Sequence, residues 1–274
     1  SVKVGASSPS TDHDRRPDLQ IGALMVALAL ECVACLLLTP DGEPGLNWLC
    51  AGPWLFTPLE GEARLSVLET LGRQLRHLQF SAPEETDPVS RFRIAVALCL
   101  GGAATEDGRK ILETGLAMLE AECAAQILPD GGHASRSPEA LAEAMLDIQT
   151  VEELLLRLGL NAPGFLTKLQ PRMAAMLSFL QEADGGILPA NGGGDSANGI
   201  AQAAMRPHGS VNSKFSFARL SAYQRIQAEG LTVYVDAGAG PERPHGVHAH
   251  AGALALTVDD GPERLITSCG SNAD

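Results

Sequence analysis

Three of the seven histidines fall within one short stretch, at His245, His248 and His250. Because residues two apart on a strand point to the same face, His248 and His250 can converge on one ligand. Such imidazoles can act as general acid and base or bind a substrate, and a merely polar strand start is the structural alternative. The spacing also suits a metal ion, but no carboxylate or Cys lies close in sequence to complete a ligand shell. We therefore predict no cofactor, with a divalent ion such as zinc or calcium as an unsupported alternative.

Two further groups of His and Arg lie near expected helix ends or on helix surfaces. His133 and Arg136 follow an Asp-Gly-Gly turn at residues 130–132, and the alternative there is a solvated turn histidine. Arg76 and His77 lie within a helical stretch but off its apolar stripe, where a solvated helix face is the alternative. The candidate catalytic residues are His133, His248 and His250, and the candidate substrate-binding residues are Arg76, His77 and Arg136.

Apolar residues recur at three- and four-residue steps through much of the chain, which is typical of amphipathic helices. Ser137 is a good N-cap, with Pro138 at the first helical position. The same Asp-Gly-Gly sequence returns at Asp184, 54 residues after Asp130, and each copy closes a helix. This repeat indicates stacked helical hairpins of an α/α architecture. Helices are expected over about residues 65–78, 92–100, 107–128, 138–158 and 164–180.

The hydrophobic period changes from helical to alternating after about residue 190. Strands are expected at residues 231–235 and 253–258, with a return strand at 264–269. Three or four strands are too few for a free-standing sandwich, so we interpret them as the first part of a larger, truncated β domain. The predicted fold class is α+β, an incomplete α/α toroid followed by the first antiparallel strands of a β-sandwich. The predicted domains are a disordered segment at 1–20, a helical toroid at 21–205 and a partial β domain at 206–274.

Charge and composition argue against several classes of function. The chain has 20 Lys and Arg against 33 Asp and Glu, a net charge of −13, which is not the electrostatic footprint of a nucleic-acid binder. Aromatic residues make up only 4 %, which counts against modules that stack sugars on exposed rings. The six cysteines sit in apolar stretches and read as buried thiols rather than as a disulfide scaffold.

One stretch, from Ile21 to Leu38, is apolar enough to resemble a membrane span. It is 18 residues long, close to the lower limit for crossing a bilayer, and Glu31 lies in its middle. A core helix is the favoured reading, and a membrane or export segment is the alternative. A membrane partner is therefore not expected, and the compartment, periplasmic or cytoplasmic, stays open.

Three segments carry a resemblance to a known family. They are DGGHASRSPEA (residues 130–140), ADGGILPANGGGD (183–195) and HAHAGALALTVDDGPERLITSCG (248–270). Together they are similar to the heparinase II/III-like proteins, relatives of polysaccharide lyases with an α/α toroid and a β-sandwich. The resemblance implies binding, and cleavage by β-elimination, of an acidic polysaccharide such as heparan sulfate or alginate. In the family, Asn or His neutralises the uronate carboxylate, and Tyr and His move the proton.

The family residues are only partly present. His248 and His250 match the family's His-x-His-Ala-Asp, but Gly252 stands in place of the Asp. Arg76 stands in place of the Asn that precedes a His on an inner helix, and His77 matches that His. The run of residues 135–140 holds no Tyr, where the family has its base. These departures favour the alternative function, a catalytically degenerate or truncated toroid that acts as a glycan-binding or interaction scaffold.

The resemblance also predicts a shared cleft. The helix of Arg76 and His77 and the loop at His133 would line its mouth, and the strand of His248 and His250 would cover it. We expect His250 within roughly 10–15 Å of His133 or His77, a span that one ligand pocket can bridge.

Overall fold

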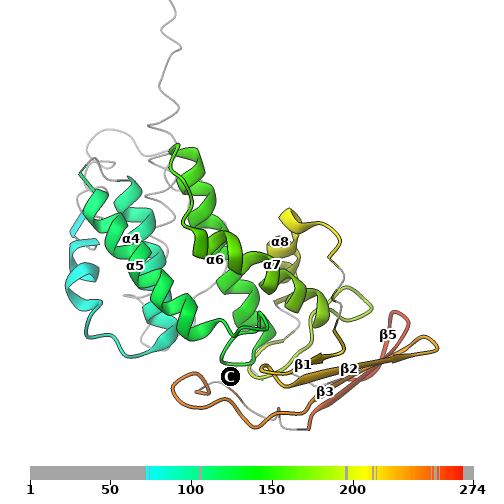
Figure 1. Cartoon of the computed structure of the whole chain (residues 1–274). Helices are drawn as coiled ribbons and strands as arrows, with labels where there is room; N and C mark the ends of the chain where they lie inside the picture. Colours follow the sequence, from blue (N-terminus) through cyan, green and yellow to red (C-terminus); the bar gives the residue numbers. More distant parts are fainter. Residues whose placement is uncertain are drawn as a thin grey trace, which may run out of the picture.

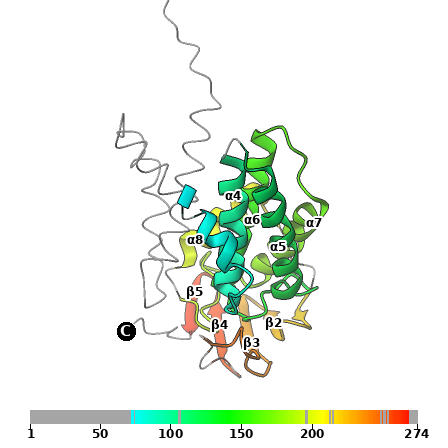
Figure 2. The same ribbon diagram turned by 90° about the vertical axis from the view of Figure 1, so that its left-hand side faces the viewer.

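A computed structural model describes residues 72–73, 75–104, 107–194, 197–211, 213, 215–247, 249, 252 and 254–267. Helices come first along the chain and an antiparallel sheet follows. Figures 1 and 2 show the sheet lying across one end of the helices. The expected order of a helical region followed by antiparallel strands is confirmed.

The helices are held together by one large apolar core and a smaller second cluster. Leu119, Met145, Met173 and Leu177 are essentially inaccessible to solvent, which matches the apolar stripes of the sequence. Burial of such side chains contributes about 1.5–3 kcal/mol each. The elements are α4 (Pro88–Ala104), α5 (Arg109–Gln126), α6 (Pro138–Arg157), α7 (Gly164–Phe179), α8 (Asn198–Met205) and the 3₁₀ helix η2 (Arg206–His208).

Helix ends follow local capping chemistry. The Ser137 hydroxyl accepts a hydrogen bond from the Ala140 amide at 3.3 Å, so the predicted N-cap of α6 is confirmed. Helix α4 begins earlier than predicted, because Asp87 accepts a hydrogen bond from the Ser90 amide at 2.8 Å and Pro88 occupies the first turn. Helix α8 was not predicted, since its eight residues are too few to show a clear period.

Five strands form one antiparallel sheet in chain order. They are β1 (Phe217–Ala218), β2 (Tyr223–Ala228), β3 (Leu231–Asp236), β4 (Leu256–Asp260) and β5 (Glu263–Ile266). Strands β3, β4 and β5 correspond to the expected strands, although β4 begins later and β5 is shorter than expected. Strands β1 and β2 were not predicted.

The two faces of the sheet differ in polarity. Tyr223 and Tyr234 are buried. The Tyr223 hydroxyl donates a hydrogen bond to the carbonyl of Arg136, and the Tyr234 hydroxyl donates one to the carbonyl of Gln181. The opposite face carries an apolar row of cross-strand neighbours. The sheet therefore contacts the helices through side chains that belong to the apolar core and also make polar contacts. The row consists of Ile226, Val233, Val258 and Ile266.

The repeated Asp-Gly-Gly sequence forms two turns of the same geometry. Gly131 and Gly185 have φ values of 93° and 89°, a left-handed conformation that favours glycine. In each turn the aspartate Oδ1 accepts a hydrogen bond from the amide two residues later, at 3.2 Å for Asp130 and 2.8 Å for Asp184. An isolated β-bridge closes each loop. We call them the first turn (residues 130–132) and the second turn (residues 184–186).

The remaining sequence expectations concern the cysteines and the candidate membrane span. Cys99 and Cys123 are buried free thiols, and burial raises the pKa of each to about 12. Among the helices in the described ranges, none has the length and apolar character to span a bilayer. The stretch from Ile21 to Leu38 lies outside the described residues, so both readings of it stay predictions.

Candidate functional site

His133 lies in a buried chain of polar side chains just after the first turn. The amide of Ser135 donates to Nδ1 of His133 at 3.1 Å, so this nitrogen is the acceptor and Nε2 carries the proton. Nε2 then donates to the side-chain oxygen of Gln126 at 3.3 Å, and the Ser135 hydroxyl lies 2.7 Å from Nδ1. Gln126 in turn donates to Glu122 at 3.0 Å, and Glu122 pairs with Arg91 at 2.6 Å. Both imidazole nitrogens are therefore used within the protein.

The surroundings of His133 favour the neutral imidazole. Burial, with repulsion from His245 as a smaller contribution, lowers the pKa of His133 to about 4. The imidazole of His245 adds a second polar group here, and its Nδ1 is buried without a hydrogen-bond partner among the described residues. A histidine with so low a pKa is a weak proton acceptor at neutral pH.

Arg136 is buried between the helical region and the sheet. Its guanidinium pairs with Asp236 of β3, and it donates to the carbonyls of Ala239 and Ser221, the latter at 2.9 Å. The guanidinium also lies over the ring of Tyr223, 5.2 Å from its centre. Only 7 % of Arg136 is exposed, and its φ of 60° is unusual for a residue other than glycine. This arrangement holds the guanidinium inside the protein.

Asn191 completes the contact around Arg136. Its side-chain amide donates to the Tyr223 hydroxyl at 2.6 Å and to Asp236 Oδ2 at 3.0 Å. The Tyr223 hydroxyl donates to the carbonyl of Arg136 at 2.6 Å. Burial, with Asp236 as the next contribution, raises the pKa of Tyr223 above its ordinary value. We call Arg136, Asn191, Tyr223 and Asp236 the interdomain cluster.

The interdomain cluster leaves no room at two nearby glycines. A Cβ atom at Gly252 would lie 2.5 Å from Asn191 Oδ1 and 2.8 Å from Asp236 Oδ2. A Cβ atom at Gly238 would lie 2.6 Å from the guanidinium carbon of Arg136. The aspartate that the family resemblance implies at residue 252 therefore has no space in this arrangement and would face Asp236.

The other predicted site residues are not brought into this arrangement by the described structure. Arg76 and His77 are exposed on a helical segment whose Leu75 and Leu78 are buried. His248 and His250 lie outside the described residues, so the expected approach of His250 to His133 or His77 stays a prediction. Of the described side chains, no group of three or more His, Cys, Asp or Glu is placed to hold a metal ion.

Sequence reasoning missed three members of the interdomain cluster. The sequence pattern places Asn191 in a loop, and it singles out neither Asp236 nor Tyr223, which does not match the family's base. Asp236 directly follows the expected strand of residues 231–235, and a carboxylate that continues a buried strand was the available signal.

The comparisons with known proteins agree with this architecture. The family model "Heparinase II/III-like, C-terminal" matches residues 211–273. Two solved structures share the fold. Heparinase III has a TM-score of 0.60 at 12 % identity, with 96 % of this chain and 44 % of that chain covered. The heparan sulfate lyase HepC from Pedobacter heparinus has a TM-score of 0.59 at 14 % identity, with 87 % and 44 % covered.

One relative by sequence is named for its localisation and not, like the two solved structures, for an enzymatic activity. The chain is 30 % identical over 225 residues to the FtsZ-localized protein C of Caulobacter vibrioides (strain NA1000 / CB15N), with 81 % of this chain and 38 % of that protein covered. The chain thus spans less than half the length of the relatives it matches. The helical region followed by an antiparallel sheet is the fold that the chain shares with these two lyases. The chain resembles the heparinase II/III-like proteins in the sequence of residues 211–273 and in its fold.

Proposed function

We propose that this chain is a non-catalytic heparinase II/III-like module that acts as an interaction scaffold. The observation that carries the proposal is the burial of His133 and Arg136, the two candidate residues that follow the first turn, in contacts within the protein. β-Elimination on a uronate needs a base within reach of the substrate and a group that stabilises the carboxylate of the carbanion.

Neither requirement is supported at the first turn. His133 is buried and already bonded at both nitrogens, and its pKa of about 4 leaves it little tendency to take a proton at neutral pH. The guanidinium of Arg136 is committed to Asp236, and removing it from that pair would leave a buried carboxylate alone. Binding a uronate at Arg136 would therefore cost more free energy than binding it at an exposed arginine.

The partner of the scaffold is suggested by the sequence relative. The FtsZ-localized protein C is similar over most of this chain, whereas the two lyases are similar in fold alone. We propose that this chain likewise localises with FtsZ. The alternative partner is an acidic polysaccharide such as heparan sulfate or alginate, which the lyase relationship favours.

Two measurements on the purified chain test the proposal. The chain is incubated with heparan sulfate and with alginate, and the ultraviolet absorbance of an unsaturated product is followed beside a heparinase III control. Co-sedimentation with FtsZ polymers is measured on the same preparation. The expected result is no product with either glycan and sedimentation of the chain with FtsZ.

Two outcomes would overturn the proposal separately. Product that disappears in the His250→Ala variant would establish a lyase and contradict the non-catalytic assignment. Failure to sediment with FtsZ, with calorimetric binding to one of the two glycans, would replace FtsZ by a polysaccharide as the partner.

A further inference from the structure

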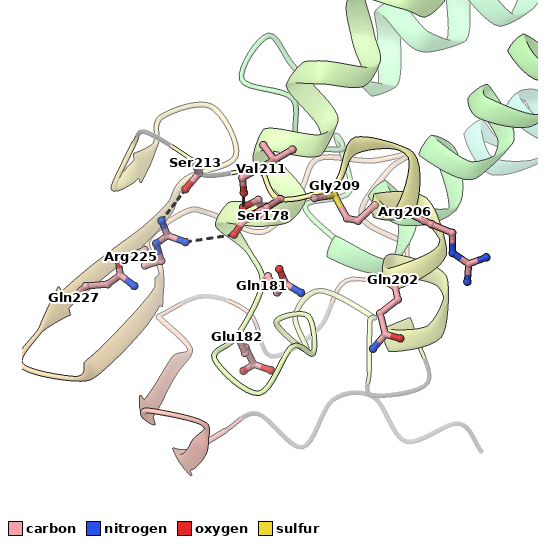
Figure 3. A pocket seen from close by; sticks show the side chains of 12 residues that line it. Ser178, Gln181, Glu182, Gln202, Arg206, Gly209, Val211, Ser213, Arg225 and Gln227 are labelled. Carbon is pink, nitrogen blue, oxygen red and sulfur yellow. Dashed lines mark hydrogen bonds between the residues drawn. The ribbon is translucent and has the colours of Figure 1, made fainter.

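A polar hollow lies beside the second turn, between the end of α7, helix α8 and strand β2. Its volume is about 640 Å³, within the range of small-molecule sites. Figure 3 shows side chains from these three elements around one open space. We call it the glutamine hollow, because three glutamines line it. The lining residues used below are Gln181, Gln202, Gln227, Met205, Arg206 and Arg225.

The charged side chains at the hollow are already committed or point elsewhere. Arg225 donates to the carbonyls of Ser178 at 3.4 Å and Phe179 at 3.2 Å, at the end of α7, and to the Ser213 hydroxyl at 2.7 Å. A cation at a helix C-terminus is stabilised by the helix dipole, so Arg225 needs no anionic ligand. Arg206 is exposed, and Figure 3 shows it directed away from the other labelled residues.

The carboxylate at the floor of the hollow is also neutralised. Glu182 is buried and pairs with Arg264 of β5 at 2.7 Å. Its side chain has no exposed area, so it offers no contact to a cation in the hollow. The charged groups therefore give a ligand of either sign little to bind.

The three glutamines offer hydrogen bonds that are still open. Gln181 donates from its amide to the Gly185 carbonyl at 3.2 Å, and Gln227 donates to the Thr232 hydroxyl at 3.3 Å. Each primary amide has two donor positions and an acceptor oxygen, so both keep donor and acceptor capacity. All three glutamines are exposed at the hollow, and no hydrogen bond of the Gln202 side chain occurs within the described residues.

We infer that the glutamine hollow is a binding site for a neutral, hydroxyl-rich ligand of saccharide size. Hydroxyl groups donate and accept in turn, as the glutamine amides do, and Met205 offers an apolar contact for the C–H face of a sugar ring. Among the described lining side chains the exposed charge is Arg206, which Figure 3 shows directed away from the other labelled residues, and this distinguishes the site from one for a uronate. The inference does not depend on the first turn being non-catalytic.

Calorimetric titration of the chain with neutral disaccharides tests the inference. The probes are cellobiose, maltose and N,N′-diacetylchitobiose, with cellobiuronic acid as the charged counterpart of cellobiose. At least one neutral probe should bind, and raising the salt concentration should leave its affinity unchanged. Gln202→Ala and Gln227→Ala should each weaken that binding about tenfold, the typical effect of losing one hydrogen bond.

Arg206→Ala is the matched control at the rim of the hollow. Its binding of the neutral probe should equal that of the unaltered chain, and all three variants should keep the circular dichroism of the folded protein. Failure of all three neutral probes to bind would overturn the inference. So would tighter binding of cellobiuronic acid than of cellobiose, with loss of that binding in Arg206→Ala, since this would make the site anionic.

Discussion

The first and second turns have the same sequence and backbone geometry, but the protein uses them differently. Both close a helix and both contact the sheet through the aspartate. Asp130 accepts hydrogen bonds from the amides of Leu220 and Ser221 at 2.9 and 2.7 Å, and Asp184 pairs with Arg264 at 2.9 Å. The second turn lies beside the open glutamine hollow, whereas the first leads into the closed interdomain cluster.

The difference lies in the residues that follow each turn. Three residues after the first aspartate comes His133, and the corresponding position in the second repeat is Ile187. Arg136 corresponds to Ala190 in the same way. At these two positions the first repeat therefore has titratable side chains, and the second has apolar ones. Both turns thus join helices to the sheet. The candidate residues His133 and Arg136 are found after the first turn only.

The largest expected effect comes from breaking the interdomain cluster. Arg136→Ala leaves Asp236 buried without its partner, which typically costs about 3–5 kcal/mol of unfolding free energy. Urea unfolding measures this loss. Arg157→Ala is the control, because the pair of Arg157 with Glu153 on the surface of α6 contributes only about 0.3–0.5 kcal/mol. Equal effects of the two variants would contradict the structural role of Arg136.

A matched pair of glycine variants compares the turns directly. A Cβ atom at Gly131 would lie 2.2 Å from the carbonyl oxygen of Arg172, whereas one at Gly185 meets nothing within 4 Å. Gly185→Ala should cost about 1–2 kcal/mol for the left-handed backbone alone. Gly131→Ala should cost about 1–3 kcal/mol more, because the carbonyl must move. Thermal unfolding of both variants checks the order, and a milder effect at Gly131 would show that the two turns are not packed as described.

A smaller effect is expected in the pH dependence of stability. The pKa of His133 is lowered from 6.5 to about 4 on folding, so between these values the unfolded chain binds a proton that the folded chain does not. His133 therefore lowers the free energy of unfolding as the pH falls through this window, by up to about 3 kcal/mol, and has no effect at higher pH.

Comparison with one variant isolates this contribution. Burial raises the pKa of Asp147 to about 7, which acts in the opposite direction on acidification. His133→Gln should lose stability less steeply than the unaltered chain between pH 6.5 and 4. Identical slopes for the two proteins would show that His133 titrates normally.

Much of the helical region could be predicted from the sequence, and most of the site could not. The apolar stripes of α5, α6 and α7 and the cap at Ser137 are local signals, and local geometry confirmed them. Strand β2 was not predicted because its exposed Gln224 and Gln227 interrupt the alternation of apolar and polar residues that indicates a strand. The pair of Arg136 and Asp236 joins residues 100 positions apart, which spacing along the chain cannot indicate.

Titration of the His133 imidazole by NMR tests the central claim most directly, because the claim makes this side chain a structural group and not a base. The resonance should stay that of the neutral form, with the proton on Nε2, down to about pH 5, and heparan sulfate should not change it. A midpoint near 6.5, together with a shift when heparan sulfate is added, would place His133 in an accessible glycan site and contradict the account.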